Sequence, residues 1–413
     1  MTDATLPISG AAEPTVLSGT SDAPRPHLVT LIAVTATGPL ALNMFVPSMP
    51  SLAADFGVSY GTAQLTLTLF LVAVALGQLF WGPVSDRFGR RPMVLLGMAL
   101  FALGSLLAWL ATSIEVLLAA RALQAFGGSA GMVLTRAIVR DMHAREKSAS
   151  MMGYIMMAMS VAPLIAPLIG GILDAGFGWR ASFVVLTLSG LMVLALAMFD
   201  LHETNHRRQC QSAGAFLYDL WTLLREPRLI GWAMTMSLSS GMFFAFLAGA
   251  PYVMVTLLDR TPAEYGLYFA LISLGYMFGN FLSGRFSERC GPNRMIRYGL
   301  IAGIIGASLL LALFGAGVVA PWSLFLPVGI IAIANGLTLP SAIANIVSVR
   351  PDLAGAASGL GGSIQIGFGA LATIGVGLGA QGNSALPLAV LIFAFAILAI
   401  VAYLVTPKRM DMA

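Results

Sequence analysis

Charged residues are scarce in this chain, and their scarcity excludes most kinds of soluble protein. Of 413 residues only 10% are charged and 58% are hydrophobic, whereas soluble domains carry roughly 25% charged residues. The mean hydropathy is +0.87. Too few polar groups are present to cover a particle of 43.2 kDa in water. Most of the surface must therefore face lipid.

Cysteine and histidine are also rare. The two cysteines, Cys210 and Cys290, show no CxxC spacing, and the four histidines lie in predicted loops or at predicted helix ends. We therefore expect no disulfide framework, no metal site and no cofactor. The apolar segments also lack HExxH, GxSxG, a Walker loop and paired aspartates. These absences argue against an enzyme and against an ATP-driven pump.

What the chain has instead is a series of long apolar segments. Helical runs of about 20 residues are long enough to cross a hydrocarbon core of roughly 30 Å. We predict such helices at 28–48, 60–82, 92–113, 115–138, 149–173, 180–200, 228–257, 263–285, 294–315, 319–347, 353–380 and 385–405. The prediction is an all-α membrane protein with twelve transmembrane helices. We therefore expect a lipid bilayer to surround the protein.

The predicted helices fall into two halves of six, at 27–200 and 228–406, separated by a loop at 201–227. The apolar residues of this loop recur at helical spacing, which predicts an amphipathic helix on the membrane surface; they are Phe216, Leu217, Leu220, Trp221, Leu223 and Leu224. Residues 1–26 lack the basic start and apolar run of a signal peptide. We expect them to form a disordered cytoplasmic tail, with a second tail at 407–413.

A direct repeat supports the division into halves. At a constant offset of 202 residues, Gly82, Asp86, Arg87 and Gly89 recur as Gly284, Glu288, Arg289 and Gly291. Internal repeats of this kind are common in transporters, where the substrate site lies between the two copies.

The arginines and lysines predict the orientation. With the amino terminus inside, 19 of the 22 basic residues fall in cytoplasmic segments, as the positive-inside rule requires. Both termini are then cytoplasmic. The basic pI of 9.3 reflects this topology and gives no support to nucleic-acid binding.

The segment from Gly82 through Asp86, Arg87 and Gly89 to Arg90 and Arg91 resembles the signature loop of the major facilitator superfamily. Within it, the chain resembles the Bcr/CflA drug:proton antiporters, which export bicyclomycin and chloramphenicol. The resemblance implies a major facilitator fold in a bacterial inner membrane. It also implies that the loop, with Glu288 and Arg289 in its repeat, gates the conformational change.

The fourth predicted helix carries Arg121, Gln124 and several glycines on one face, which resembles the second motif of the family. An arginine inside a membrane span is costly unless it faces a cavity or a partner. We therefore expect Arg121 to point inward. A role in coupling and a purely structural role, bonding backbone carbonyls, are equally good interpretations.

The fifth predicted helix resembles the motif associated with antiporters in this superfamily. Small residues and prolines form two adjacent stripes; the motif residues are Ala162, Pro163, Ala166, Pro167, Gly170 and Gly171. Small residues allow helices to approach closely, and prolines kink them. A leak-tight hinge between the halves is the expected use, and ordinary close packing is the alternative.

The first predicted helix departs from the family pattern. Asn43 stands where the resemblance leads us to expect an acid, the usual site for protons and cations. No carboxylate falls at the middle of any predicted span. The resemblance implies protons as coupling partners, but Asn43 puts both this coupling and a preference for cationic drugs in doubt.

We therefore expect an exporter of small amphipathic drugs or metabolites that works by alternating access, as a monomer. The predicted substrate-binding residues are Asn43, Arg121, Gln124, Phe243, Phe246, Tyr252, Tyr276 and Asn335. A neutral or zwitterionic substrate is favoured, because no central carboxylate would neutralise a cation. The alternative is an exporter or facilitator of nucleoside-like or sugar-like metabolites with weak or no proton coupling.

Overall fold

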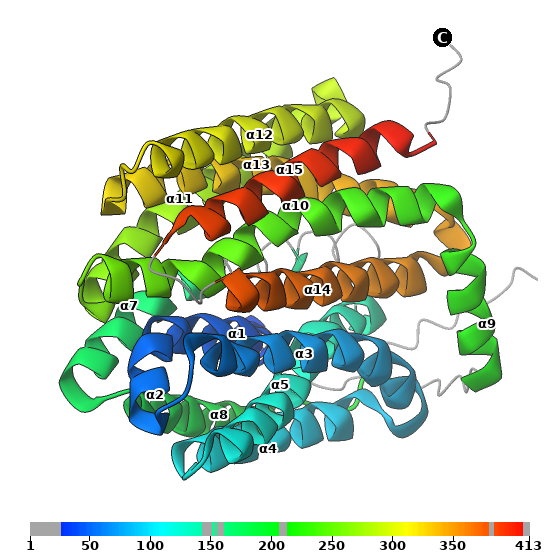
Figure 1. The fold of residues 1–413 in the computed structure, drawn as a ribbon. Coiled ribbons are helices and arrows are strands. Elements are labelled where there is room, and N and C mark those ends of the chain that lie inside the picture. Colours follow the sequence, from blue (N-terminus) through cyan, green and yellow to red (C-terminus); the bar gives the residue numbers. More distant parts are fainter. Residues whose placement is uncertain are drawn as a thin grey trace, which may run out of the picture.

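The structure is a computed structural model that describes residues 26–142, 151–152, 155, 161–205, 213–379 and 384–407. Every regular element in these ranges is helical (Figure 1). The elements are α1 (Leu28–Phe45), η1 (Val46–Ser48), α2 (Met49–Phe56), α3 (Tyr60–Phe88), α4 (Arg90–Trp109), α5 (Ile114–Met142), α7 (Val161–Phe177), α8 (Arg180–Asp200), α9 (Ala213–Leu224), α10 (Pro227–Pro251), η2 (Tyr252–Leu257), α11 (Pro262–Cys290), α12 (Pro292–Gly315), α13 (Pro321–Val349), η3 (Pro351–Leu353), α14 (Ala354–Gly379) and α15 (Leu386–Val405).

The predicted fold class is confirmed. Within the described residues, 11 helices are long and apolar enough to cross a membrane, and the shorter apolar helix α7 supplies the remaining predicted span. The predicted amphipathic helix is α9, whose Leu217 and Trp221 are exposed while Leu223 is buried. The predicted tails, 1–26 and 407–413, lie almost wholly outside the described residues.

Two predicted boundaries were wrong. The first span was expected to end at residue 48, but the chain continues through η1 and α2 to Phe56, because Pro47 and Pro50 open new helical turns, where proline is tolerated. The segment from Gly82 was expected to be a loop, but it is helical as far as Phe88. The Ser85 hydroxyl bonds to the Gly82 carbonyl at 2.7 Å, and Gly89 ends the helix instead.

Helices α3 and α11 make the internal repeat visible. Each has 29 residues. The hydroxyls of Ser59 and Thr261 cap their amino termini by accepting a backbone N–H bond. Gly89 and Gly291 end them with φ of +102° and +77°, a region that glycine adopts without strain. The offset of 202 residues therefore holds from cap to cap.

The two groups of helices meet along two seams (Figure 1). Helix α14 runs beside α3, and α11 runs beside α7, so each seam pairs one helix from each half. Helix α9 lies across one end of the bundle, beside the ends of α10 and α14. These seams are where the halves would have to separate if the molecule changed conformation.

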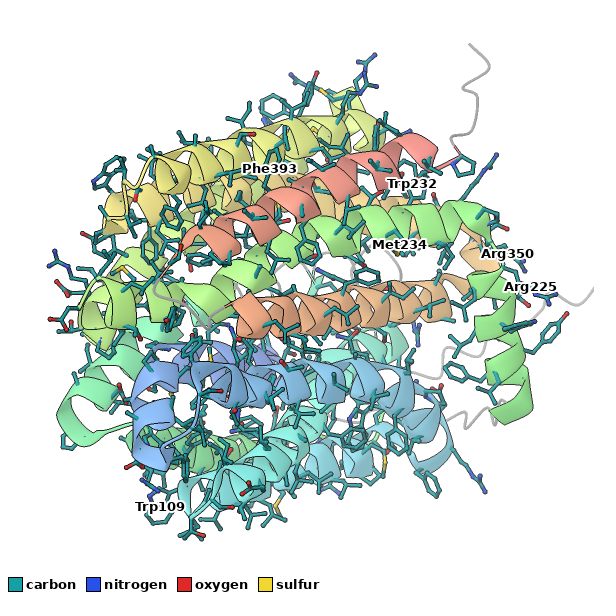
Figure 2. The ribbon with its side chains drawn as sticks, in the orientation of Figure 1. Trp109, Arg225, Trp232, Met234, Arg350 and Phe393 are labelled. Atoms are coloured by element: carbon teal, nitrogen blue, oxygen red, sulfur yellow. The ribbon has the colours of Figure 1, made fainter. Side chains whose placement is uncertain are left out.

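Side chains differ between the two ends of the bundle. Arg225 and Arg350 lie at the end that carries α9, and Trp109 lies at the opposite end (Figure 2). We call the first the basic end, because it also holds Arg87, Arg90 and Arg91, and the second the opposite end. Between them, the outward-facing side chains are largely apolar, including exposed Leu76, Leu188 and Leu271. This apolar belt suits the lipid of a membrane.

Candidate functional site

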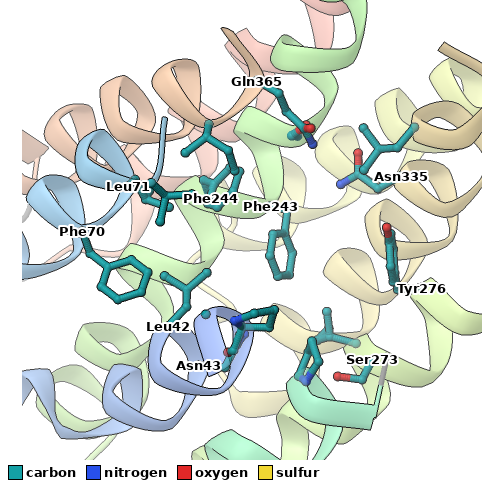
Figure 3. Close-up of a pocket in the computed structure, with 18 of the residues that line it drawn as sticks. Leu42, Asn43, Phe70, Leu71, Phe243, Phe244, Ser273, Tyr276, Asn335 and Gln365 are labelled. Carbon is teal, nitrogen blue, oxygen red and sulfur yellow. The ribbon is translucent and has the colours of Figure 1, made fainter. Parts of the chain in front are cut away.

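A cavity of about 240 Å³ lies between the two halves, near the middle of the helices. Its wall on the first half is mostly apolar and includes Leu42, Phe70 and Leu71. Its wall on the second half combines the phenylalanines Phe243, Phe244 and Phe269 with Ser240, Ser273, Tyr276, Asn335 and Gln365. Phe243 projects into the middle of the cavity (Figure 3). None of the lining residues is charged.

The polar groups of the second half form short hydrogen-bonded pairs across helices. Ser239 donates to the Asn335 Oδ1 atom at 2.9 Å, which joins α10 to α13. Gln365 Nε2 donates to the Ser240 hydroxyl at 2.8 Å, which joins α10 to α14. These bonds fix the two amides at the cavity surface, where a ligand can meet a directional polar group beside an aromatic one.

Two further polar groups are buried at the cavity without a partner in the described chain. Asn43 Nδ2 donates to the Pro39 carbonyl at 2.8 Å, but its Oδ1 atom has no hydrogen bond. The Ser273 hydroxyl is also unsatisfied. An unpaired buried polar atom costs about 1–3 kcal/mol. Both atoms are covered by neighbouring side chains in this structure, so a ligand would reach them only after those side chains move.

The structure brings together half of the residues predicted to bind substrate. Asn43, Phe243, Tyr276 and Asn335 line the cavity. Phe246 does not: it is fully buried behind the wall, stacked on Phe269 at a centroid distance of 6.0 Å. Tyr252 lies farther away and packs against Tyr60 at 5.0 Å. Gln365 and Ser240 were missed, although a lone glutamine in a glycine-rich apolar span was a usable signal.

Arg121 and Gln124 lie inside the first half, one side chain behind the cavity wall. The Arg121 side chain is fully buried, and its guanidinium lies 4.3 Å from the centre of the Phe70 ring, which itself lines the cavity. Arg121 Nη1 donates to Gln124 Oε1 at 2.5 Å, and Gln124 donates to Ser105 at 2.7 Å. The remaining Arg121 nitrogens, Nε and Nη2, have no partner in the described chain.

The two stripes of α7 have different neighbours. A Cβ atom at Gly170 would lie 1.8 Å from the Met44 carbonyl of α1, so this stripe packs within the first half together with buried Ala166. A Cβ atom at Gly171 would lie 2.3 Å from the Pro262 carbonyl of α11, so the other stripe crosses to the second half. Pro163 lines the cavity. The proposed hinge function of these residues, with Ala162 and Pro167, stays a prediction.

The cavity is closed toward the opposite end by bonds between the halves. Tyr60 and Gln64 of α3 both donate to the Ala248 carbonyl of α10, at 2.7 and 2.9 Å. Thr68 and Thr373 share a hydrogen bond of 2.6 Å between α3 and α14. Residues from both halves therefore seal this end, and Tyr252 belongs to the seal.

The signature segment at the basic end is organised around Arg90. Its side chain is buried and pairs with Asp86 at 2.6 Å and with Asp141 of α5 at 2.9 Å. The backbone N–H of Arg90 also donates to Glu203 at 2.9 Å, and that of Arg91 at 3.3 Å. Glu203, from the segment after α8, therefore caps α4 with a carboxylate, as the helix dipole favours. Sequence reasoning missed Glu203.

The same glycine that ends α3 makes room for this carboxylate. A Cβ atom at Gly89 would lie 2.4 Å from Glu203 Oε2. The neighbouring residues Gly82 and Arg87 take no part in these bonds, and Arg87 is exposed beside Phe88. In the second half, Glu288 and Arg289 are exposed and form no ion pair with a described residue, so no contact in the described chain supports the gating role that the resemblance implied for them. The structure thus assembles a charge network in the first half.

Comparison with known proteins agrees with this architecture. A model of the Major Facilitator Superfamily matches residues 31–360, and the chain belongs to this superfamily. Its fold resembles that of a bacterial homologue of the human lysosomal transporter Spinster, with a TM-score of 0.67, 17% identity, and coverage of 91% of this chain and 95% of that one.

Curated relatives support the resemblance to bicyclomycin and chloramphenicol exporters. An uncharacterized MFS-type transporter of Bacillus subtilis, YdgK, is 33% identical, covering 89% of this chain and 91% of its own. A bicyclomycin resistance protein homologue of Haemophilus influenzae is 31% identical, covering 83% and 87%. A chloramphenicol resistance protein of Pseudomonas aeruginosa is 34% identical, covering 76% and 72%. The predicted family is confirmed.

Proposed function

We propose that this protein exports small amphipathic drugs or metabolites across the bacterial inner membrane by alternating access. The observation that carries this proposal is the uncharged cavity at the junction of the two halves, which is sealed at the opposite end by bonds between them. Aromatic rings supply adaptable apolar contact, and Asn335 and Gln365 supply directional bonds. Relatives named for bicyclomycin and chloramphenicol resistance support export of such molecules.

The orientation follows from the charges. We place the basic end, with α9 and both termini, in the cytoplasm. In this orientation the structure has its periplasmic side closed. The network around Arg90 then sits at the cytoplasmic boundary, away from the central cavity, which supports a gating role for Gly82, Asp86, Arg87, Gly89, Arg90 and Arg91 rather than contact with substrate.

The cavity favours a substrate without a strong positive charge. Neither half places a carboxylate on its wall, so a buried cation would lose its hydration without gaining a partner. Arg121, behind Phe70, adds a positive potential on the side of the first half. A neutral or zwitterionic amphipathic molecule suits this wall.

Proton antiport is the coupling that the family resemblance suggests, but position 43 gives it no titratable group. Asn43 is only 3% exposed, and an amide does not titrate in the physiological range. Coupling to protons would have to use a carboxylate outside the cavity. The alternative is a metabolite exporter or facilitator with weak or no proton coupling.

The test of function and coupling is efflux from cells that lack their own exporters. We expect the protein to lower the accumulation of chloramphenicol, and Phe243→Ala to abolish most of this effect by removing the ring at the centre of the cavity. Unchanged accumulation across a panel of antibiotics, with export of a nucleoside or sugar instead, would favour the alternative.

For coupling, Asn43→Asp should increase the dependence of efflux on external pH and improve the recognition of a cationic dye over a neutral one. The matched control is Asn335→Asp, which places a carboxylate in the same cavity but on the other half. Identical pH profiles for wild type and Asn43→Asp would show that position 43 does not set coupling here.

A further inference from the structure

A second hollow, of about 410 Å³, opens at the basic end between α3, α5, α9 and α14. We call it the basic vestibule. Its polar lining comes from Gln78, Asp86, Arg90, Arg136, Arg140 and Ser358, and its apolar lining includes Leu79, Val133, Phe216 and Leu220. Phe216 and Leu220 belong to α9, so the amphipathic helix forms one wall. A site with a charged side and an apolar side suits an amphipathic ligand.

The charge of the basic vestibule is positive and not neutralised within the described chain. Asp86 is already paired with Arg90, which also takes up Asp141. Arg136 and Arg140 lie one turn apart on α5 with exposed side chains, and neither is paired with an acidic side chain of the described residues. An exposed pair of unpaired guanidiniums favours a carboxylate, sulfonate or phosphate group.

Arg140 also reaches the helix on the far side of the basic vestibule. Its Nη1 atom would lie 3.3 Å from a Cβ atom at Gly355, so the guanidinium sits beside the first turn of α14, which contains no acidic residue. The Arg140 guanidinium therefore lies against the vestibule wall that α14 supplies.

The basic vestibule leads toward the central cavity. On α3, Gln78 of the vestibule lies one turn beyond Val74 of the cavity, and on α5, Val133 directly follows the cavity residue Met132. Between the hollows, Gln78 packs over Gly362 of α14, where a Cβ atom would lie 2.6 Å from its Oε1. Farther along α5, Arg121 lies behind the cavity wall, separated from the cavity by the Phe70 ring, and is likewise bonded to no carboxylate of the described residues. The positive charges of α5 thus lie at the basic vestibule and behind the cavity wall, and none lines the cavity itself.

We propose that the protein exports, besides neutral substrates, amphipathic substrates that carry an acidic group, that the basic vestibule receives these anions, and that the membrane potential drives their export. This inference rests on the proposed export function and on the basic end being cytoplasmic. The cytoplasm is the negative side of the membrane, so an anion moves outward downhill. A potential of about 100 mV corresponds to a roughly 50-fold concentration ratio for a monovalent anion. Such transport needs no proton-binding carboxylate in the cavity. This agrees with the presence of an amide, Asn43, at the position where an acid was expected.

The test compares two probes with the same aromatic skeleton in reconstituted vesicles. 1-Anilinonaphthalene-8-sulfonate is anionic, and N-phenyl-1-naphthylamine is its neutral counterpart. Vesicles of phosphatidylcholine are loaded with each probe, and an interior-negative potential is imposed with a potassium gradient and valinomycin, without a pH gradient. We expect the potential to accelerate protein-dependent efflux of the anionic probe and to leave that of the neutral probe unchanged.

The variant Arg136→Gln/Arg140→Gln should lower kcat/KM for the anionic probe about tenfold, because two charge-assisted contacts are lost. Efflux of the neutral probe should stay within about twofold of wild type. The matched control is Arg294→Gln/Arg297→Gln, two exposed arginines on α12 that line neither hollow. This control should leave both probes unaffected.

Five outcomes would count against the proposal. An equal loss for both probes would assign Arg136 and Arg140 to the conformational change instead of anion recognition. Efflux of the anionic probe that ignores the potential would remove the driving force proposed here. A defect seen only in vesicles containing phosphatidylglycerol would make the basic vestibule a lipid site. Efflux of the neutral probe alone would reject this inference and leave export standing, whereas efflux of neither probe, with no drug efflux in cells, would reject export itself.

Discussion

The segment that ends α3 and the segment that ends α11 can be compared position by position. Both helices have 29 residues and both end at a glycine with positive φ, Gly89 and Gly291. Beyond the glycine their chemistry separates. Arg90 and Arg91 follow Gly89, whereas Pro292 and Asn293 follow Gly291. The backbone of the repeat has been kept, and the side chains have diverged.

The divergence changes what each segment holds together. In the first half, Arg90 joins α3, α4 and α5 by ion pairs, and Glu203 brings in the segment after α8. In the second half, Asn293 accepts a bond of 2.9 Å from Asn345 of α13, a neutral contact. A buried charge network is stable while all its members are in place and costly when one is displaced. This makes the first segment suited to a switch and the second suited to a fixed joint.

The largest difference between the two segments should appear on removing Arg90. Arg90→Met leaves Asp86 and Asp141 without their partner and should cost about 2–4 kcal/mol, somewhat less than the roughly 3–5 kcal/mol for a fully buried ion pair, because Asp86 is 40% exposed. We expect a clear fall in the unfolding temperature in detergent and loss of transport. Arg289→Met, in the exposed second segment, is the control and should change neither. Equal effects of the two variants would mean that the network does not distinguish the halves.

The sequence was sufficient to predict the fold but only part of the site. The fold was predicted from signals that extend over many residues: apolar runs, the offset of 202 residues and the distribution of arginines. A wrong interpretation of one residue therefore changes the predicted fold little. Glu203 could not be found in this way, because it reaches Arg90 only when the chain after α8 folds back 113 residues in sequence. Arg121 was expected to face inward, but only the packing of Phe70 shows that a ring separates it from the cavity.

Replacing the two glycines by alanine should reveal a smaller difference in stability between the two segments. Alanine at either position is strained, because φ is +102° at Gly89 and +77° at Gly291 with ψ near 155°, a region open almost only to glycine. At Gly291 a Cβ atom meets nothing within 4 Å, whereas at Gly89 it meets Glu203 at 2.4 Å. Gly291→Ala should therefore cost about 1–2 kcal/mol, and Gly89→Ala about 1–2 kcal/mol more.

The measurement is the unfolding temperature of each alanine variant, and the two losses are then compared. In a Glu203→Ala background, adding Gly89→Ala should lower the unfolding temperature no more than Gly291→Ala does in the wild type, since the added Cβ atom then meets no carboxylate. If Gly89→Ala and Gly291→Ala were equally destabilised, the carboxylate would have to move away from Gly89 without cost, and its role as a cap for α4 would be wrong.

The smallest effect tests whether the charge of Glu203, apart from its shape, serves the switch. In Glu203→Gln one amide oxygen can still accept the N–H bonds that Oε1 now accepts from Arg90 and Asn205, at 2.9 Å each. The bond from Arg91 to Oε2, 3.3 Å long, is lost, because the amide nitrogen is a donor. The carboxylate also stabilises the positive end of α4, so Glu203→Gln should lower the free energy of unfolding by about 1 kcal/mol. If the network breaks and reforms in each transport cycle, the variant should change the rate of the conformational change. The affinity of the distant cavity for substrate should stay the same. We therefore expect kcat for efflux to change severalfold with little change in KM, and Glu288→Gln, its exposed counterpart in the second half, to leave both unchanged. A raised KM with unaltered kcat would place Glu203 in substrate binding and would remove the distinction between a switching first segment and a fixed second one.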